Sequence, residues 1–241
     1  MTLSARRIRA ITRKELREFR HNGSIVVTMA VLPMIFIIPP LIAILELSSS
    51  QAGGLLSGDP LAYLLGIPAL VPATVAAYSV VGERAQGTLE PVLTTPIRRE
   101  EFLLGKALAA VVPSLAVSYV VFGLFLACVA LFAHPAVVSA VFQGRDLVAQ
   151  VLFTPLIAGW AIWLGMAIST RVSEIRVAQQ LGVVASIPSA VVTALIAYDV
   201  IQITPGLVTF FAVLLLMLDV VGYRFVSALF DRERLMTGTK S

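Results

Sequence analysis

The sequence predicts an all-α membrane protein with six transmembrane helices, preceded by an amphipathic interfacial (elbow) helix and with both termini in the cytoplasm. Hydrophobic residues make up 58% of the 241 residues and charged residues only 13%, whereas a soluble domain carries about a quarter charged residues. The mean hydropathy is +0.93, and several apolar runs reach the roughly 20 residues that cross about 30 Å of hydrocarbon. The basic residues gather in connections that fall on one side of such a topology, as the positive-inside rule requires.

The first element is an amphipathic helix within residues 1–24, which we expect to lie along the inner membrane surface. A helical period places Ile8, Ile11, Leu16 and Phe19 in one arc. The opposite arc holds six cations, namely Arg6, Arg9, Arg13, Lys14, Arg17 and Arg20. Glu15 lies inside the apolar arc, where a carboxylate either meets a cation or backbone donor or reaches out to water. No cleavable signal peptide is apparent, so the first span is expected to stay in the membrane.

The six spans follow as parts of a single transmembrane domain over residues 1–241. They are predicted at residues 25–47, 60–81, 107–132, 150–170, 181–198 and 207–230. The outer connections are short and leave no room for a sizeable folded domain. In the second of them, the mildly apolar residues 135–142 form either a surface loop or a short re-entrant helix.

The charge distribution sets the orientation of these spans. Of the 18 Lys and Arg residues, seven precede Ile25, four lie in residues 82–106, two in 171–180 and four from Arg224 onward, which leaves only Arg145. The positive-inside rule therefore places both termini and the 82–106 loop in the cytoplasm. The net charge of +4 and the pI near 9.6 then reflect topology, and no nucleic-acid partner is expected.

Few polar or bulky aromatic residues fall inside the spans. Asp219, in the sixth span, is an intramembrane carboxylate, which is a functional candidate by default, although it can also pair with Arg224 or a neighbouring helix. Trp160 and Trp163 share one face of the fourth span and either line an export pathway or pack between helices. Prolines interrupt the first two spans and permit kinks, which are static or part of a conformational switch. They are Pro33, Pro39, Pro40, Pro68 and Pro72.

The most informative segment is the 82–106 loop, the longest predicted cytoplasmic connection. Thr88 can cap a short helix whose first turn tolerates Pro91. Leu89, Val92 and Leu93 then share one face. A helix of about two turns is unstable alone in water, so this face needs a surface to cover it, supplied by the membrane or by a soluble partner.

The residues of this loop resemble the signature of type 2 ABC transporter permeases. The matching groups are Glu83-Arg84, Gly87-Thr88-Leu89-Glu90, Leu93-Thr94-Thr95-Pro96 and Gly105-Lys106. Their position between the second and third spans agrees with that family, as does the preceding helix with Lys14-Glu15. The resemblance implies an exporter in which two permease chains, identical or related, pair with two cytoplasmic ATP-binding subunits.

The resemblance also implies roles for individual residues. A coupling helix that docks into a cleft of the ATPase would be formed by Gly87, Thr88, Leu89, Glu90, Leu93, Thr94 and Pro96. Glu83 and Arg84 would make polar contacts at its entry, while the alternative is that the segment is an orderly intracellular turn. Family members that export large polysaccharides or carry external domains usually need additional features that this sequence lacks, so the resemblance does not identify the substrate.

No catalytic, cofactor-binding or metal site of its own is expected in the chain. Gly105-Lys106 resembles the end of a phosphate-binding loop, but Glu100 stands where glycine is needed and Ala107 where Ser or Thr is needed. We therefore expect ATP and Mg²⁺ to bind in the partner ATPase. Glu100-Glu101 is interpreted as a solvated helix start, because the histidines of an intramembrane protease are missing around it. The two histidines, His21 and His134, are predicted on opposite sides of the membrane.

Together these features predict a multi-pass permease of the inner (plasma) membrane that is not an enzyme. It would couple ATP hydrolysis in separate subunits to outward transport of a lipid-like, drug-like or other small substrate, in contact with membrane lipids. The alternative is a membrane scaffold or assembly factor that recruits a cytoplasmic partner without transport. A membrane-embedded hydrolase ranks third.

Overall fold

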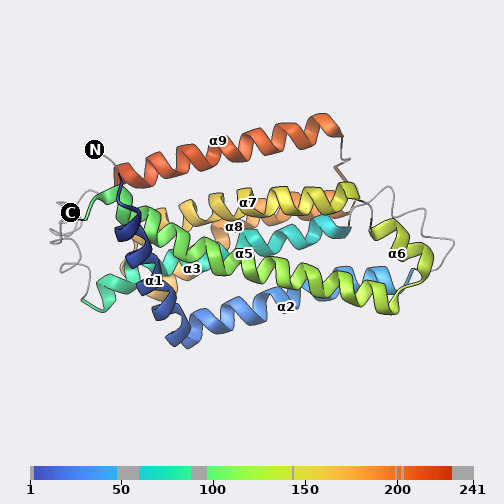
Figure 1. Cartoon of the computed structure of the whole chain (residues 1–241), viewed down its shortest axis with the longest axis horizontal. Helices are drawn as coiled ribbons and strands as arrows, with labels where there is room; N and C mark the ends of the chain where they lie inside the picture. Colours follow the sequence, from blue (N-terminus) through green and yellow to red (C-terminus); the bar gives the residue numbers. More distant parts are fainter. Residues whose placement is uncertain are drawn as a thin grey trace.

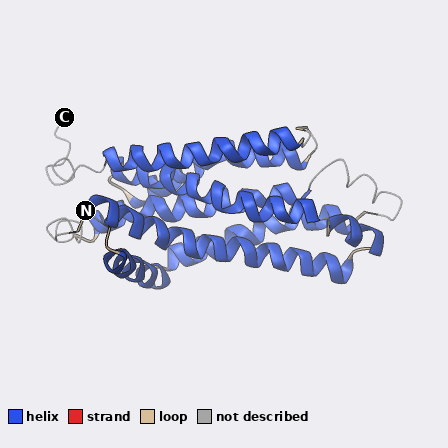
Figure 2. Ribbon diagram, turned by 45° about the horizontal axis from the view of Figure 1, so that its top comes forward, coloured by secondary structure: helices blue, strands red, loops and turns tan. Residues whose placement is uncertain are grey.

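The computed structural model describes residues 3–47, 60–87, 97–142, 144–198, 200–201 and 204–229, and all regular structure within them is helical (Figure 2). The elements are α1 (Ala5–His21), α2 (Gly23–Leu45), the 3-10 helix η2 (Pro60–Leu65), α3 (Gly66–Ala85), α5 (Arg99–Phe132), α6 (Pro135–Val141), α7 (Gly144–Arg171), α8 (Ile175–Ala197) and α9 (Pro205–Leu229). Six helices in these ranges are long and apolar enough to cross a membrane. The expected all-α fold with six spans is confirmed.

Several helices begin earlier than the hydropathy of the sequence indicates. Helix α5 starts at Arg99, α7 at Gly144 and α8 at Ile175, whereas the corresponding spans were expected from residues 107, 150 and 181. Hydropathy marks only the part of a helix that suits hydrocarbon. Backbone hydrogen bonds continue into the polar flanking turns, so the helices are longer than their apolar segments.

Helix α3 lies at the centre of the bundle. It packs against α7, α8, α5 and α2, and its membrane-crossing segment is buried throughout. Four alanines on it have no exposed surface, namely Ala69, Ala73, Ala76 and Ala77. Small residues let neighbouring helices approach closely, which is how helices associate in lipid.

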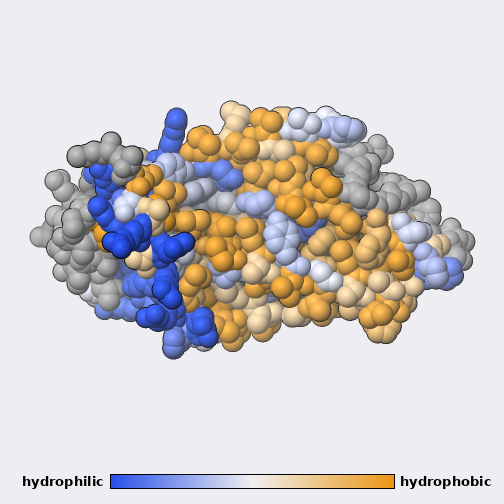
Figure 3. All heavy atoms as spheres, in the orientation of Figure 1, coloured by the Kyte–Doolittle hydropathy of each residue, from blue (hydrophilic) through white to orange (hydrophobic). Residues whose placement is uncertain are grey.

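The outer helices keep apolar surface exposed over the middle of the molecule. Only 6% of the membrane-crossing window of α9 and 19% of that of α2 are buried. In Figure 3 hydrophobic side chains cover the central part of the visible face, and hydrophilic ones gather over α1. An apolar band of this kind suits a lipid environment, so the chain is a multi-pass membrane protein.

Helix α1 crosses one end of the bundle, where α9 also ends (Figure 1). Its buried residues Ile11, Glu15 and Phe19 face the protein, and α5 is its main neighbour. A Cβ atom at Gly105 of α5 would lie 2.7 Å from Ile11, so glycine permits this close approach. The apolar arc expected from the sequence thus packs on α5, while the position of α1 at a membrane surface stays a prediction.

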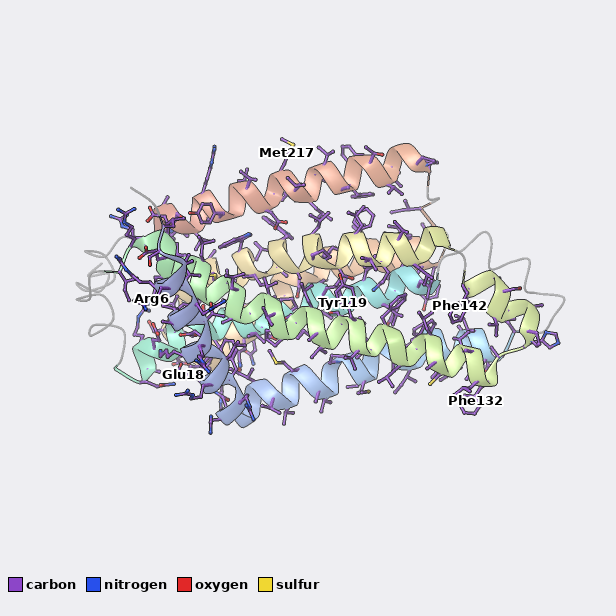
Figure 4. All side chains as sticks on the ribbon, in the orientation of Figure 1. Arg6, Glu18, Tyr119, Phe132, Phe142 and Met217 are labelled. Atoms are coloured by element: carbon purple, nitrogen blue, oxygen red, sulfur yellow. The ribbon has the colours of Figure 1, made fainter. Side chains whose placement is uncertain are left out.

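Residues 135–141 form the short helix α6 at the end of the bundle opposite α1 (Figure 1). His134 caps it, since its side chain accepts a hydrogen bond from the Ala136 backbone N–H. Val137 and Val141 are buried in a cluster with Val129 of α5. Figure 4 shows Phe132 and Phe142 near this end and Arg6 and Glu18 on α1 at the other. The segment is therefore a packed helix and not an irregular loop.

Candidate functional site

Four charged side chains from three helices meet at the α1 end of the bundle. Lys14 and Glu15 come from α1, Glu83 from α3 and Lys106 from α5. We call these four residues the ion-pair cluster. Lys106 Nζ lies 2.9 Å from Glu15 Oε1 and 3.2 Å from Glu83 Oε1, and Lys14 Nζ lies 2.8 Å from Glu83 Oε1. The cluster joins segments that are about 70 to 90 residues apart in sequence.

Lys106 is the most deeply buried member, because its side chain has no exposed surface. Its ammonium donates hydrogen bonds to Glu15 Oε1 at 2.9 Å and to the Ser79 carbonyl oxygen at 2.8 Å. It also lies 4.9 Å from the centre of the Phe102 ring, within the range of a cation–π contact. An isolated buried cation would be strongly destabilising. Two nearby carboxylates and a carbonyl replace the water that this ammonium loses.

Lys14 lies at the rim of the cluster with 40% of its side chain exposed. Besides Glu83 it contacts Glu18 at 2.9 Å and Glu15 at 3.4 Å. Burial alone would lower the pKa of Lys14, but hydrogen bonds to Glu83 and Glu18 and the charges of Glu83 and Glu15 raise it above its ordinary value. Lys14 therefore stays charged at neutral pH.

The carboxyl of Glu15 is nearly buried, and burial raises its pKa. The charge of Lys106 opposes that rise, the charge of Glu83 adds to it, and Lys106 and Lys14 together only partly stabilise the ionised form. Because only 2% of Glu15 is exposed, its side chain does not extend to water. The cation that the sequence left unspecified is Lys106.

A second contact between α1 and α5 lies beside the cluster. The Ser4 backbone N–H donates to Glu101 Oε1 at 2.8 Å, and Arg7 lies 3.1 Å from Glu101 Oε2. Glu101 also accepts from the Arg98 backbone N–H at 3.2 Å, as in a capping box. Only 1% of Glu101 is exposed. The interpretation of Glu100-Glu101 as a solvated helix start is wrong for Glu101, because α1 crosses over it, and holds for Glu100, which is exposed.

The chain leaves α3 toward the 88–96 segment through a defined turn. Gly87 has φ of 68°, a left-handed conformation that favours glycine after a helix end. Just before it, Arg84 donates to the Val172 carbonyl oxygen at 3.1 Å and so contacts the connection between α7 and α8. The residues that precede and follow 88–96 are thus held by other parts of the protein: Glu83 and Arg84 on one side, and Glu101 and Lys106 on the other.

The site residues expected from the sequence fall into two groups. The structure brings Lys14, Glu15 and Glu83 together. Arg84 instead contacts the Val172 carbonyl oxygen, and Gly87 lies in the turn after α3. The remaining members of the coupling segment lie outside the described residues; these are Thr88, Leu89, Glu90, Leu93, Thr94 and Pro96. Sequence reasoning missed Lys106 and Glu101 as partners of α1. The available signal was the carboxylate of Glu15 in an apolar arc, which requires a cation.

Asp219, Trp160 and Trp163 lie elsewhere, between α7 and α9. The Asp219 carboxylate packs against Gly159, where an added Cβ would lie 2.7 Å from Oδ1. Trp160 lines an apolar cavity of about 260 Å³. Trp163 packs on Gly222 and meets the Tyr223 ring edge-on at 5.5 Å. The two tryptophans therefore differ, since one packs between helices and the other faces a cavity.

Asp219 is not paired with Arg224. Arg224 is exposed, and Asp219 Oδ1 is buried with no hydrogen-bond partner in the part of the chain that the structure describes. Insertion scales put a charged residue at the centre of a membrane helix at about 2.5 to 3.5 kcal/mol. This carboxylate is the clearest unexplained polar group within the spans.

The chain also matches a known family. The profile described as "ABC-2 family transporter protein" matches residues 9–217, from α1 into α9. A comparison with curated proteins finds no match.

Proposed function

Since this chain belongs to the ABC-2 family of transporter proteins, we propose that it is the permease subunit of an ATP-driven exporter and that residues 88–96 couple it to a separate ATPase. The family is a membrane component of ABC transporters and not the ATPase itself. ATP and Mg²⁺ would bind in the partner subunits, and the permease would move a lipid-like, drug-like or other small substrate outward across the inner (plasma) membrane.

The observation that supports coupling is the ion-pair cluster, two of whose members flank residues 88–96 in the sequence. Glu83 precedes this segment and contacts Lys14 of α1, and Lys106 follows it and contacts Glu15 of α1. A force applied to residues 88–96 would therefore act on α3, α5 and α1 together. Because α3 is packed on all sides, it would transmit that displacement to its neighbours in the membrane.

In this proposal two permease chains and two cytoplasmic ATP-binding subunits form the transporter, with Leu89, Val92 and Leu93 buried against the ATPase and Glu90 at a polar contact beside them. Closure of the ATPases would push on the coupling segment and reorient the helices. The chain itself would perform no bond chemistry.

The test removes the docking face without touching the bundle. The variants are Leu89→Ala combined with Leu93→Ala, and Glu90→Lys alone. Interface hot spots lose about 2 kcal/mol or more when truncated, roughly a thirtyfold fall in affinity. We expect a co-expressed ATP-binding subunit from the same operon to be lost from pull-downs, and export from reconstituted vesicles to stop, while the permease remains inserted and monodisperse.

Matched controls lie at the opposite end of the bundle. Leu131→Ala changes a leucine that is 76% exposed at the end of α5, and Glu46→Lys reverses an exposed carboxylate just after α2. Both should retain the ATPase. Coupling variants that still bind the ATPase and export would make residues 88–96 an ordinary turn. A wild-type chain that binds the ATPase but exports nothing would favour the scaffold alternative.

A further inference from the structure

An apolar cavity of about 260 Å³ lies between α7, α8, α9 and η2. Its wall includes Phe153 and Trp160 of α7, Val192 of α8 and Phe211 of α9. Among its described lining residues, only Ser189 and Thr193 carry hydroxyl groups, and Thr193 donates its hydroxyl proton to the Ala190 carbonyl oxygen within α8. The wall therefore suits the apolar part of a ligand.

Asp219 is not itself a lining residue of this cavity, but it comes next along α9, on the side toward α1. It directly follows Leu218 and comes one helical turn after Leu215, both of which line the cavity. Across from it, Gly159 precedes Trp160, another lining residue. The inward position of Asp219 contrasts with Met217, which points away from the bundle (Figure 4) and is 61% exposed.

The surroundings of Asp219 favour a positively charged partner. Its Oδ1 atom is buried and accepts no hydrogen bond from the described residues, and no ion pair joins it to a Lys or Arg among them. Trp160 adds an aromatic ring to the wall, a surface that attracts organic cations. A lipid acyl chain would fill the apolar cavity but would leave the carboxylate without a counter-ion near the middle of α9.

We propose that this cavity binds amphiphilic organic cations, with the apolar group between α7, α8 and α9 and the ammonium beside Asp219. The proposal that a ligand binds here is supported by the geometry of these helices and does not depend on the proposed function. The role of the cavity as the entry point of the exported substrate rests on the proposed function, and it would narrow the substrate class to hydrophobic amines and quaternary ammonium compounds.

The two tryptophans of the chain, Trp160 and Trp163, allow binding to be measured without an ATPase. In a Trp163→Phe background, Trp160 is the single tryptophan and lines the cavity. The full chain in lipid nanodiscs is titrated with bromodecyltrimethylammonium, whose bromine quenches indole fluorescence, and with bromodecyl sulfate as the anionic counterpart. We expect the cation to quench Trp160 at a concentration at least tenfold lower than the anion, after subtraction of partitioning into nanodiscs without protein.

Three variants decide the role of each part. Asp219→Asn keeps the side-chain shape and should raise the half-quenching concentration of the cation at least tenfold, with little effect on the anion. Glu46→Gln removes an exposed carboxylate elsewhere and should change neither titration. Val192→Phe fills the cavity and should weaken quenching by both probes. Size-exclusion profiles of all variants confirm that they are folded.

Equal quenching of wild type by both probes, or an unchanged cation titration in Asp219→Asn, would overturn the proposal. So would strong quenching of Trp160 by brominated phosphatidylcholine that the unbrominated ammonium does not relieve, because an acyl chain would then occupy the cavity. Since no ATPase is present, these results are independent of whether residues 88–96 couple the chain to one.

Discussion

At the scale of single residues, Lys106 determines how the α1 end of the bundle is held together. Its ammonium contacts two carboxylates from different helices, Glu15 and Glu83, and together with Lys14 it compensates their charge inside the protein. A buried ion pair contributes little net stability compared with an apolar replacement of the whole group. Removal of one partner is different, because the opposite charges are then buried without compensation.

Replacement of Lys106 by methionine should therefore destabilise the protein strongly, by about 3 to 5 kcal/mol. The measurement is the thermal midpoint of the detergent-solubilised chain, followed by size-exclusion chromatography with fluorescence detection. Arg17→Met is the matched control, because Arg17 is an exposed cation on α1 and its loss should leave the midpoint nearly unchanged.

The same cluster predicts a rescue. Glu15→Gln added to Lys106→Met removes one of the two carboxylates that lose their contact with Lys106 and share Lys14 as the remaining cation, so part of the lost stability should return. A double-mutant cycle measures this coupling between residues in contact. If the two substitutions were simply additive, the contact of Lys106 with Glu15 would carry no energetic weight.

At the scale of elements, the packing of α1 on α5 depends on Gly105. A Cβ at this position would lie 2.7 Å from Ile11, and the Gly105 carbonyl oxygen accepts a hydrogen bond from Thr12 at 3.1 Å. The helices are close because there is no side chain between them. Any larger residue at position 105 must push α1 away from both Lys106 and Glu101.

Gly105→Leu should accordingly release α1 from the bundle. Limited trypsin digestion detects this release, since local opening exposes the arginine-rich helix to the protease. We expect cleavage within residues 5–21 to be several-fold faster than in wild type. Gly123→Leu is the control on the same helix, because a Cβ at Gly123 meets nothing within 4 Å. Equal cleavage rates for both variants would show that the close approach does not hold α1.

At the scale of the whole molecule, the distribution of basic residues predicts how the helical bundle is oriented in the membrane. Helix α1 and the end of α9 lie at one end (Figure 1), and the sequence places 17 of the 18 Lys and Arg residues in segments assigned to that side. The positive-inside rule then predicts that this end is cytoplasmic.

Cysteine labelling in spheroplasts measures this orientation. In a background without the native Cys128, a cysteine at Gln51 should react with an impermeant maleimide added from outside, and one at Gln86 should react only after the membrane is opened. Labelling of position 86 from outside, with position 51 protected, would reverse the topology and remove the basis for cytoplasmic coupling.

The sequence by itself determined the number and type of the long elements. Apolar runs of about 20 residues have one stable solution in lipid, a helix with its backbone hydrogen bonds satisfied internally, so six spans follow from composition and spacing. The amphipathic pattern of α1 and the motif residues from Glu83 to Lys106 were also evident, and the family comparison agrees with the resemblance that they carry.

Only the tertiary structure decided which charged side chains meet. Lys106 and Glu15 are 91 residues apart, and no local period encodes the crossing of α1 over the start of α5. The same limit applies to Asp219, for which the sequence left open a pairing with Arg224 or with a neighbouring helix. The helical turn places Asp219 toward Gly159 and Arg224 outward, because direction on a helix and contact across a bundle are set by packing between helices and not by distance along the chain.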